Sequence, residues 1–206
     1  MGKKAALVGM GCGPYTVTAE GMIAIEKADL ICGSKRMLEL LPDTGARLME
    51  EYRTSVLSEV IPEASEERIA VLYSGDVSIY SGAMELYRRL DAAGIDTRLI
   101  PGVSVVSYFA SRIGRSAEDM NVVSCHGRDM ELFLELEKGS PLFIYTSNGD
   151  DVKKICEKLS NAGKGDCEVM IGERLGYPDE RITGYMAKQV RDIEIDVLNI
   201  LFIESV

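Results

Sequence analysis

The sequence is poor in the residues from which metal sites and nucleophilic triads are built. It contains one histidine and five cysteines, at positions 12, 32, 125, 156 and 167. The cysteines form no C-x-x-C pair, and with a single histidine a zinc site is poorly supported. We therefore expect no protein-bound metal, and we interpret the cysteines as reduced, mostly buried thiols.

The sequence also lacks basic clusters and long apolar runs. Its formal net charge is −10, and a field of that sign repels phosphate backbones, so we expect no nucleic-acid partner. No segment approaches the roughly 20 apolar residues of a membrane span. The apolar run 5–10, which follows Lys3 and Lys4, is too short for a signal peptide. We therefore expect a cytoplasmic protein without membrane association and with a small-molecule ligand.

A glycine-rich turn follows this first apolar run. Gly9, Gly11 and Gly13 give G-x-G-x-G, whereas a dinucleotide fingerprint requires G-x-G-x-x-G and an acidic residue about 20 residues later. Pro14 stands at the sixth position and has no N–H to offer a phosphate. The predicted second strand, 28–32, has no acid at its end. The pattern thus predicts a strand, a tight turn and a helix, and argues against a nicotinamide or flavin site.

Apolar runs alternate with helical patterns in the first half of the chain. We predict strands at 5–10, 28–32, 69–73 and 97–100, a weaker strand at 47–50, and helices at 82–93 and 104–113. This alternation predicts a parallel sheet covered on both faces. The polar stretch 114–119 is the candidate linker. We therefore expect an N-terminal α/β lobe over 1–114 and a C-terminal α/β lobe over 119–206.

The second half of the chain changes character after one helix. We predict strands at 121–125 and 141–145, a helix at about 150–162, and strands at 167–172, 182–190 and 197–203. Because little helix separates the last three strands, hairpins or short loops must join them. The predicted fold is therefore α/β with two lobes: a mainly parallel, doubly wound N-terminal sheet and a mixed, largely antiparallel C-terminal sheet.

Each strong strand of the first lobe ends in a turn that contains glycine. In open parallel sheets ligands bind at the carboxyl ends of the strands, and glycine allows a ligand to approach main-chain groups. Asp76 follows Gly75 in one such turn, where it forms either an Asx-turn or a ligand contact. Ser104, after Pro101 and Gly102, either caps the next helix or contacts a ligand.

Taken in order, these turns resemble those of the tetrapyrrole methylases, enzymes that use S-adenosylmethionine (SAM) to methylate porphyrinoid and corrin precursors. The family shows G-x-G-P-G, then S/G-G-D-P, then P-G-V/I-S/T-S/A. This chain shows Gly9-Met-Gly11-Cys12-Gly13, Ser74-Gly75-Asp76-Val77 and Pro101-Gly102-Val103-Ser104-Val105. Cys12 and Val77 stand where the family has proline, and we expect altered rigidity with retained binding.

Two segments of the second lobe narrow the resemblance. SCHGRD (124–129) and ERLGYPDERI (173–182) resemble signatures of the branch that methylates the C5 meso carbon in corrin assembly, the cobalt-precorrin-7 C5-methyltransferases. In aerobic relatives this unit is fused to a second methyltransferase that acts at C15 and decarboxylates. The resemblance therefore implies the anaerobic arrangement, with a separate C15-methylating decarboxylase, and it also implies a homodimer.

The resemblance implies that SAM binds in a cleft between the lobes, gives S-adenosylhomocysteine as product, and lies below a corrin precursor. The implied cofactor contacts are Gly11, Cys12, Gly13, Ser74, Gly75, Asp76, Ile79, Pro101, Gly102, Ser104, Val105, Tyr145, Thr146 and Leu175. The implied catalytic residues are Asp76, His126 and Arg128, although a lone histidine is also often a packed or capping residue.

The substrate that the resemblance implies carries many carboxylates, which arginine can hold bidentately. The candidate substrate ligands are Lys35, Arg36, Arg112, Arg174 and Arg181. Solvent exposure or surface pairing is the alternative for each of these cations. Two functional alternatives also stay open. One is a methyltransferase of the same family that acts on another precorrin carbon, uroporphyrinogen III or diphthine, and the other is a nucleotide-binding module without catalysis.

Overall fold

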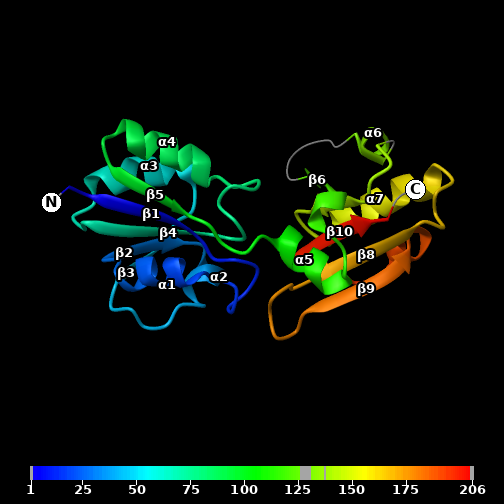
Figure 1. Ribbon diagram of the computed structural model, residues 1–206, viewed down its shortest axis with the longest axis horizontal. Coiled ribbons are helices and arrows are strands. Elements are labelled where there is room, and N and C mark those ends of the chain that lie inside the picture. The colour runs from blue at the N-terminus through cyan, green and yellow to red at the C-terminus, as the bar shows by residue number, and fades with distance from the viewer. Residues whose placement is uncertain (1, 126–130, 137, 205–206) are drawn as a thin grey trace. The chain divides into compact units, whose positions relative to one another are not determined.

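The computed structural model describes residues 2–125, 131–136 and 138–204. The chain divides into two compact units between Val105 and Val106. Each unit contains one five-stranded sheet with helices on both faces (Figure 1). The α/β class predicted from the sequence is therefore confirmed.

The first unit is built on a parallel sheet with the strand order β3-β2-β4-β1-β5. Its strands are β1 (Lys4–Gly9), β2 (Leu30–Gly33), β3 (Arg47–Glu50), β4 (Arg68–Tyr73) and β5 (Asp96–Ile100), and its helices are α1 (Ala19–Glu26), α2 (Lys35–Leu38), α3 (Thr54–Glu63) and α4 (Ala83–Ala92). All five strands were predicted, including the weak candidate at Arg47–Glu50.

Alternate side chains of β1 and β4 belong to different cores on the two faces of the sheet. Leu7 and Val71 lie in one cluster with Leu86 of α4, whereas Val8 and Leu72 lie in another with residues of α1 and α2. Figure 1 shows α3 and α4 on one face and α1 and α2 on the other. The chain therefore leaves the adjacent ends of β1 and β4 toward opposite faces. In open parallel sheets such a switch point is where ligand crevices form.

Local signals fix the helices that flank this switch point. Thr18 caps α1, its hydroxyl accepting a hydrogen bond from the Gly21 amide at 3.1 Å. The same hydroxyl donates to the Pro101 carbonyl at 3.3 Å, which ties the start of α1 to the turn after β5. On the other face, α4 buries Leu86 and Leu90 one turn apart, as the pattern over 82–93 predicts.

The second unit is built on a mixed sheet with the strand order β6-β7-β10-β8-β9. Its strands are β6 (Asn121–Ser124), β7 (Leu142–Tyr145), β8 (Glu168–Glu173), β9 (Arg181–Met186) and β10 (Asn199–Ile203), and its helices are α5 (Val105–Ile113), α6 (Leu132–Leu136) and α7 (Gly149–Asn161). Only β6 and β7 pair in parallel; the other neighbours are antiparallel, as expected. The strand predicted at 182–190 ends at Met186, and a 3₁₀ turn follows over Ala187–Asp192.

Helix α5 lies in the second unit, whereas the expected lobe boundary at 114 places it in the first. Phe109 of α5 explains the difference, because its ring centre lies 5.8 Å from that of Phe143 and 5.7 Å from that of Phe202, on β7 and β10. The opposite face of this sheet packs against α6 and α7. None of the helices in the described part of the chain is long and apolar enough to cross a membrane.

Candidate functional site

The turns after β1 and β4 are joined by two backbone hydrogen bonds. Gly11 donates its amide to the Gly75 carbonyl at 3.2 Å, and Gly75 donates its amide to the Gly11 carbonyl at 2.9 Å. Both residues have positive φ, 72° for Gly11 and 69° for Gly75, a conformation that favours glycine. The two glycines thus form an antiparallel bridge beyond the end of the parallel sheet.

The turn after β5 packs against this bridge, and only glycine permits the approach. A Cβ added to Gly102 would lie 2.3 Å from the Gly75 carbonyl oxygen and 2.6 Å from the Gly9 carbonyl oxygen. A Cβ added to Gly9 would lie 2.5 Å from the amide nitrogen of Gly102. These separations leave no room for any side chain, so three backbones meet here directly. We call the turns 9–16, 73–80 and 100–104 together the rim.

The amides of Gly11 and Gly13 are used within the protein. Thr16 Oγ1 accepts a hydrogen bond from the Gly13 amide at 2.9 Å and donates to the Gly13 carbonyl at 2.8 Å, while the Gly11 amide is bound to Gly75. These two glycines therefore shape the rim. Gly75 differs, because a Cβ added there would meet nothing within 4 Å. The open face of the rim lies in front of Gly75.

The two residues that replace family prolines anchor their turns by side-chain contacts. Cys12 lies between two rim glycines, and its Sγ donates to the Val103 carbonyl at 3.4 Å. This contact links the turns after β1 and β5. Val77 is buried and lies in the core that includes residues of α3 and α4. Both turns are therefore held in place without the proline ring.

Asp76 and Ser74 lie in the turn after β4, on either side of Gly75. Asp76 Oδ1 accepts a hydrogen bond from the Ser78 amide at 2.7 Å and another from the Ser78 hydroxyl. This is the Asx-turn that the sequence left open as an alternative to ligand binding. Ser74 is exposed, and its hydroxyl accepts a hydrogen bond from Arg36 Nη2 at 3.5 Å.

Two exposed tyrosines on the rim were not among the predicted site residues. Tyr15 is 84% exposed and Tyr80 is 55% exposed. Tyr80 also has a φ of 46°, a strained conformation for an aromatic residue. Neither belongs to a periodic pattern, and the glycines beside them were the only sequence signal that could have drawn attention to them.

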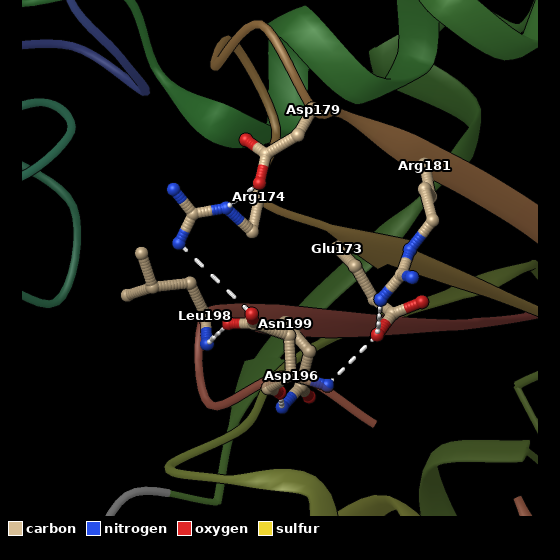
Figure 2. Close-up of polar contacts among 7 residues, drawn as sticks. All are labelled: Glu173, Arg174, Asp179, Arg181, Asp196, Leu198 and Asn199. Atoms are coloured by element: carbon tan, nitrogen blue, oxygen red, sulfur yellow. Dashed lines mark hydrogen bonds and ion pairs between the residues drawn. The ribbon is translucent and has the colours of Figure 1, made fainter. Parts of the chain in front are cut away.

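In the second unit, the segment between β8 and β9 is organised by ion pairs of Arg174 (Figure 2). Its Nε lies 2.6 Å from Asp179 Oδ2, and its Nη1 lies 3.9 Å from Asp196 Oδ2. The guanidinium carbon also lies 4.9 Å from the centre of the Tyr177 ring. The side-chain hydrogen bond from Arg174 holds the pKa of Asp179 below its ordinary value. Arg174 itself has a φ of 49°, the conformation that otherwise favours glycine.

Glu173, at the buried end of β8, forms a second group of contacts in the same view (Figure 2). Its Oε1 accepts hydrogen bonds from Arg181 Nη2 at 3.0 Å and from the Asp196 amide at 2.8 Å. Asp196 therefore contacts both groups, although no sequence pattern marks it. It lies 23 residues after Glu173, in a loop without a motif.

The remaining predicted cofactor contacts of this unit are largely buried. Thr146 Oγ1 lies 2.5 Å from Asn199 Oδ1 and 2.9 Å from the Asn199 carbonyl oxygen. Tyr145 packs edge-on against Phe143, with ring centres 5.2 Å apart. Leu175, next to Arg174, is also buried.

All five cations predicted to bind substrate contact polar groups of the protein itself. Lys35 pairs with Glu39, Arg36 with the Ser74 hydroxyl, Arg112 with Glu180, Arg174 with Asp179, and Arg181 with Glu173. This is the surface-pairing alternative that the sequence left open. A ligand carboxylate would therefore have to replace a protein carboxylate at Arg112, Arg174 or Arg181.

The structure brings together the predicted cofactor contacts of the first unit, whereas Tyr145, Thr146 and Leu175 lie at the ends of two different strands of the second unit. The rim holds those of the first unit up to Ser104, and Val105 begins α5. Among the catalytic candidates, His126 and Arg128 lie outside the described residues, so only Asp76 is placed. Over the residues that are described, no three His, Cys, Asp or Glu side chains gather as metal ligands would.

Comparison with known proteins places these features in a family. The family model "Tetrapyrrole (Corrin/Porphyrin) Methylases" matches residues 4–189. A cobalt-precorrin-7 C(5)-methyltransferase of Salmonella typhimurium is 32% identical over 199 residues, which are 95% of this chain and 97% of the relative. A precorrin-4 C(11)-methyltransferase of Rhodococcus erythropolis is 36% identical over 197 residues, 83% of this chain and 78% of the relative. The solved structure of an Archaeoglobus fulgidus precorrin-6Y methylase has the same fold, with a TM-score of 0.74, 24% identity, and coverage of 100% of this chain and 99% of that one.

Proposed function

This chain belongs to the tetrapyrrole methylases and is a methyltransferase of the cobalamin pathway, and from that premise we propose that it transfers a methyl group from SAM to the C5 meso carbon of a cobalt-precorrin. The Salmonella typhimurium relative, which matches nearly the whole chain, carries this activity in its name. The signatures at 124–129 and 173–182 support the same acceptor carbon.

The observation that carries the proposal is the rim at the switch point between β1 and β4. Three turns meet there through backbone contacts of Gly9, Gly75 and Gly102, and the space in front of Gly75 is open. Such a site can bind a nucleoside through its shape and through hydrogen bonds to main-chain groups, without catalytic or charged side chains. The residues present therefore fit an adenosyl group better than they fit a metal or a nucleophilic intermediate.

Bound SAM supplies an electrophilic methyl group on a sulfonium. The chain's own contribution is to orient the two reactants and to exclude water, and orientation alone is worth roughly 7–11 kcal/mol. We assign Ser74, Asp76 and Ile79 to the cofactor on one side of the rim, and Pro101, Gly102, Ser104 and Val105 on the other. We also assign Tyr145, Thr146 and Leu175 of the second unit to the cofactor. The Asx-turn of Asp76 fixes the loop, which keeps its exposed neighbours in place.

We assign the substrate carboxylates to cations that can exchange partners. Arg174 and Arg181 would exchange Asp179 and Glu173 for the substrate. Arg36 contacts the rim residue Ser74, and Lys35 precedes Arg36 in the chain. His126, outside the described residues, remains our candidate to accept the proton that the ring loses after methylation. Arg128, also outside the described residues, is always protonated, and we assign it to the carboxylates of the ring.

A second acceptor is favoured by one specific observation. The precorrin-4 C(11)-methyltransferase of Rhodococcus erythropolis has a higher percentage identity, 36% against 32%, although the match covers less of both chains. Methylation at C11 is therefore the alternative. Both reactions use the same cofactor rim, so the position of the new methyl group distinguishes them.

The decisive experiment incubates the purified chain with SAM labelled with ¹³C in the methyl group and, in separate reactions, with cobalt-precorrin-7 or a precorrin-4-type acceptor. We expect a labelled product whose carbon NMR places the methyl group at C5. A methyl group at C11 of a precorrin-4-type acceptor, with none at C5, would establish the alternative. Transfer to neither acceptor would contradict both.

Cofactor binding is tested separately with S-adenosylhomocysteine. At 100 times its Kd this product should stabilise the protein by about 2.7 kcal/mol, seen as a higher Tm. Asp76→Ala should weaken the shift. Asp43→Ala is the matched control, because Asp43 forms a similar turn with the Gly45 amide, at 3.1 Å, away from the rim. A Tm that rises with NAD or flavin, and not with S-adenosylhomocysteine, would favour a nucleotide-binding module.

The same proposal includes the setting in which the enzyme works. We propose a cytoplasmic homodimer that acts on a corrin precursor, with a separate enzyme supplying C15 methylation and decarboxylation. Sedimentation equilibrium tests the dimer, and a product that retains the carboxylate expected to be lost in the C15 reaction tests the division of labour.

A further inference from the structure

Glu180 joins two segments that the proposed function assigns to the cofactor. Its carboxylate accepts a hydrogen bond from Arg112 Nε at 2.7 Å and from the Gly176 amide at 2.7 Å. The side chain of Tyr108 forms a third hydrogen bond to it. Tyr108 and Arg112 lie one turn apart on α5, whereas Gly176 lies in the turn between β8 and β9.

The degree of burial sets this contact apart from an ordinary surface ion pair. The Glu180 side chain is 11% exposed, although Arg112 is 57% exposed. Burial alone would raise the pKa of Glu180, but the hydrogen bonds from Gly176, Tyr108 and Arg112 together hold it below its ordinary value. The carboxylate is therefore kept charged by three donors from two segments.

On one side, Glu180 fixes the beginning of α5. Tyr108 lies three residues after Val105, less than one helical turn, so a shift at Tyr108 moves Val105 with it. Phe109 packs α5 on the sheet of the second unit through Phe143 and Phe202. The hydrogen bonds of Tyr108 and Arg112 to Glu180 add a polar attachment to this apolar one.

On the other side, Glu180 fixes the turn that contains Leu175. The Gly176 amide that it binds follows Leu175 directly, and Gly176 has a φ of 78°. Arg174, two residues before Gly176, has a φ of 49°, a conformation that a residue with a side chain keeps only when its surroundings hold it. Glu180, the last residue before β9, holds this turn through its hydrogen bond with the Gly176 amide.

We propose that Glu180 is a positioning residue for the cofactor, which sets the spacing between the start of α5 and the Leu175 turn through Tyr108, Arg112 and Gly176. The proposal rests on the proposed function, because Val105 and Leu175 are cofactor contacts only if SAM binds as stated above. It also gives Arg112 the role of a structural partner of Glu180 in place of a ligand for substrate.

The test measures S-adenosylhomocysteine binding by calorimetry and the KM for SAM in Glu180→Gln. The amide oxygen can still accept from Gly176, but the charged contact with Arg112 is lost. We expect Kd and the KM for SAM to rise about tenfold, with kcat at saturating SAM and the KM for the corrin changed less than about twofold. Glu204→Gln is the matched control, since it breaks an arginine–glutamate pair of the same length, 2.7 Å, with Arg115.

Arg112→Gln provides the second variant, because an exposed side chain can be replaced without unfolding the protein. If Glu180 acts through Arg112, the double variant binds no more weakly than Glu180→Gln alone. Equal Kd in Glu180→Gln and wild type, while wild type binds S-adenosylhomocysteine, would overturn the positioning role. Absence of binding in wild type would instead overturn the proposed function.

Discussion

The turns at the strand ends are held by backbone contacts in the first unit and by side-chain ion pairs in the second. In the first unit the rim is held by backbone hydrogen bonds and by glycines such as Gly102, which lies so close to the Gly75 carbonyl that no Cβ would fit between them. In the second unit the turn between β8 and β9 is held by charged side chains, with Arg174 and Glu173 at the centre. A turn held by backbone contacts keeps its conformation when a side chain changes, as Cys12 and Val77 illustrate in place of the family's prolines. A turn held by side-chain ion pairs loses a contact whenever one of those residues is replaced.

The largest expected effect comes from filling the contact between the rim turns. Gly102→Ala places a methyl group 2.3 Å from the Gly75 carbonyl oxygen, so the turns must separate. We expect the free energy of unfolding to fall by about 3 kcal/mol and the Tm response to S-adenosylhomocysteine to disappear. Urea unfolding gives the first quantity.

Gly184→Ala is the control for this change. Gly184 lies in β9, has no atom within 4 Å of its added Cβ, and should change stability by less than about 0.5 kcal/mol. A Gly102→Ala protein as stable as wild type would show that the rim is not close-packed.

The second prediction separates backbone from side chain at Arg174. Arg174→Ala and Arg174→Gly both lose the contacts with Asp179 and Asp196, but only glycine relieves the φ of 49°. Arg174→Gly should therefore be more stable than Arg174→Ala by about 1 kcal/mol. Parallel urea titrations measure the difference, and equal stabilities would mean that the side-chain network does not impose the strain.

The third prediction concerns low pH, which should lower the stability wherever a charged carboxylate stabilises the fold. Glu51, which follows β3, is the clearest case in the first unit, because hydrogen bonds from Arg53 and Tyr52 lower its pKa to about 2 from an ordinary value of 4.5. A lowered folded-state pKa contributes stability that is present above the ordinary pKa and is lost as pH falls through the folded value.

Stability should therefore decline between about pH 5 and pH 2, and the decline should be shallower in Glu51→Gln. Glu50→Gln, at the neighbouring exposed position, should show the same pH dependence of the free energy of unfolding as the wild type. Unfolding measured by circular dichroism at several pH values gives the slopes. Identical slopes in wild type and Glu51→Gln would contradict the assignment.

The smallest expected effect is at Cys12. Cys12→Pro restores the residue that the family carries and removes the contact between Sγ and the Val103 carbonyl. Because the rim is held by glycine backbones, we expect less than about 0.5 kcal/mol change in stability and less than a twofold change in Kd for S-adenosylhomocysteine. A tenfold loss of affinity would show that the thiol contact sets the width of the rim.

Most of the fold follows from patterns that depend on neighbouring residues. Every strand was predicted, because apolar runs bounded by glycine leave few alternatives. Helix α3 was missed because Pro62 and the β-branched residues at its start weaken the helical pattern, although Leu57 and Ile61 lie one turn apart in the core. The segment 187–190 was predicted as strand because Ala187 and Val190 are apolar, but they bury their side chains from a 3₁₀ turn.

The candidate site was predictable in position and less so in its contacts. The glycines of the rim identified the strand ends, but their amides were expected to face a ligand and those of Gly11 and Gly13 bind the protein. The partners of Arg112 and Arg174 come from segments distant in sequence, Glu180 and Asp196, and no local pattern marks such pairs. Long-range pairing of charges is set by the tertiary fold.

The bridge between Gly11 and Gly75 has a consequence for how the first unit opens. The segments that follow β1 and β4 lead to helices on opposite faces, so any separation of the two helical layers at this end must first break the paired amides of Gly11 and Gly75. Hydrogen exchange at these two positions should consequently be slow for loop residues and should report the opening of the whole sheet.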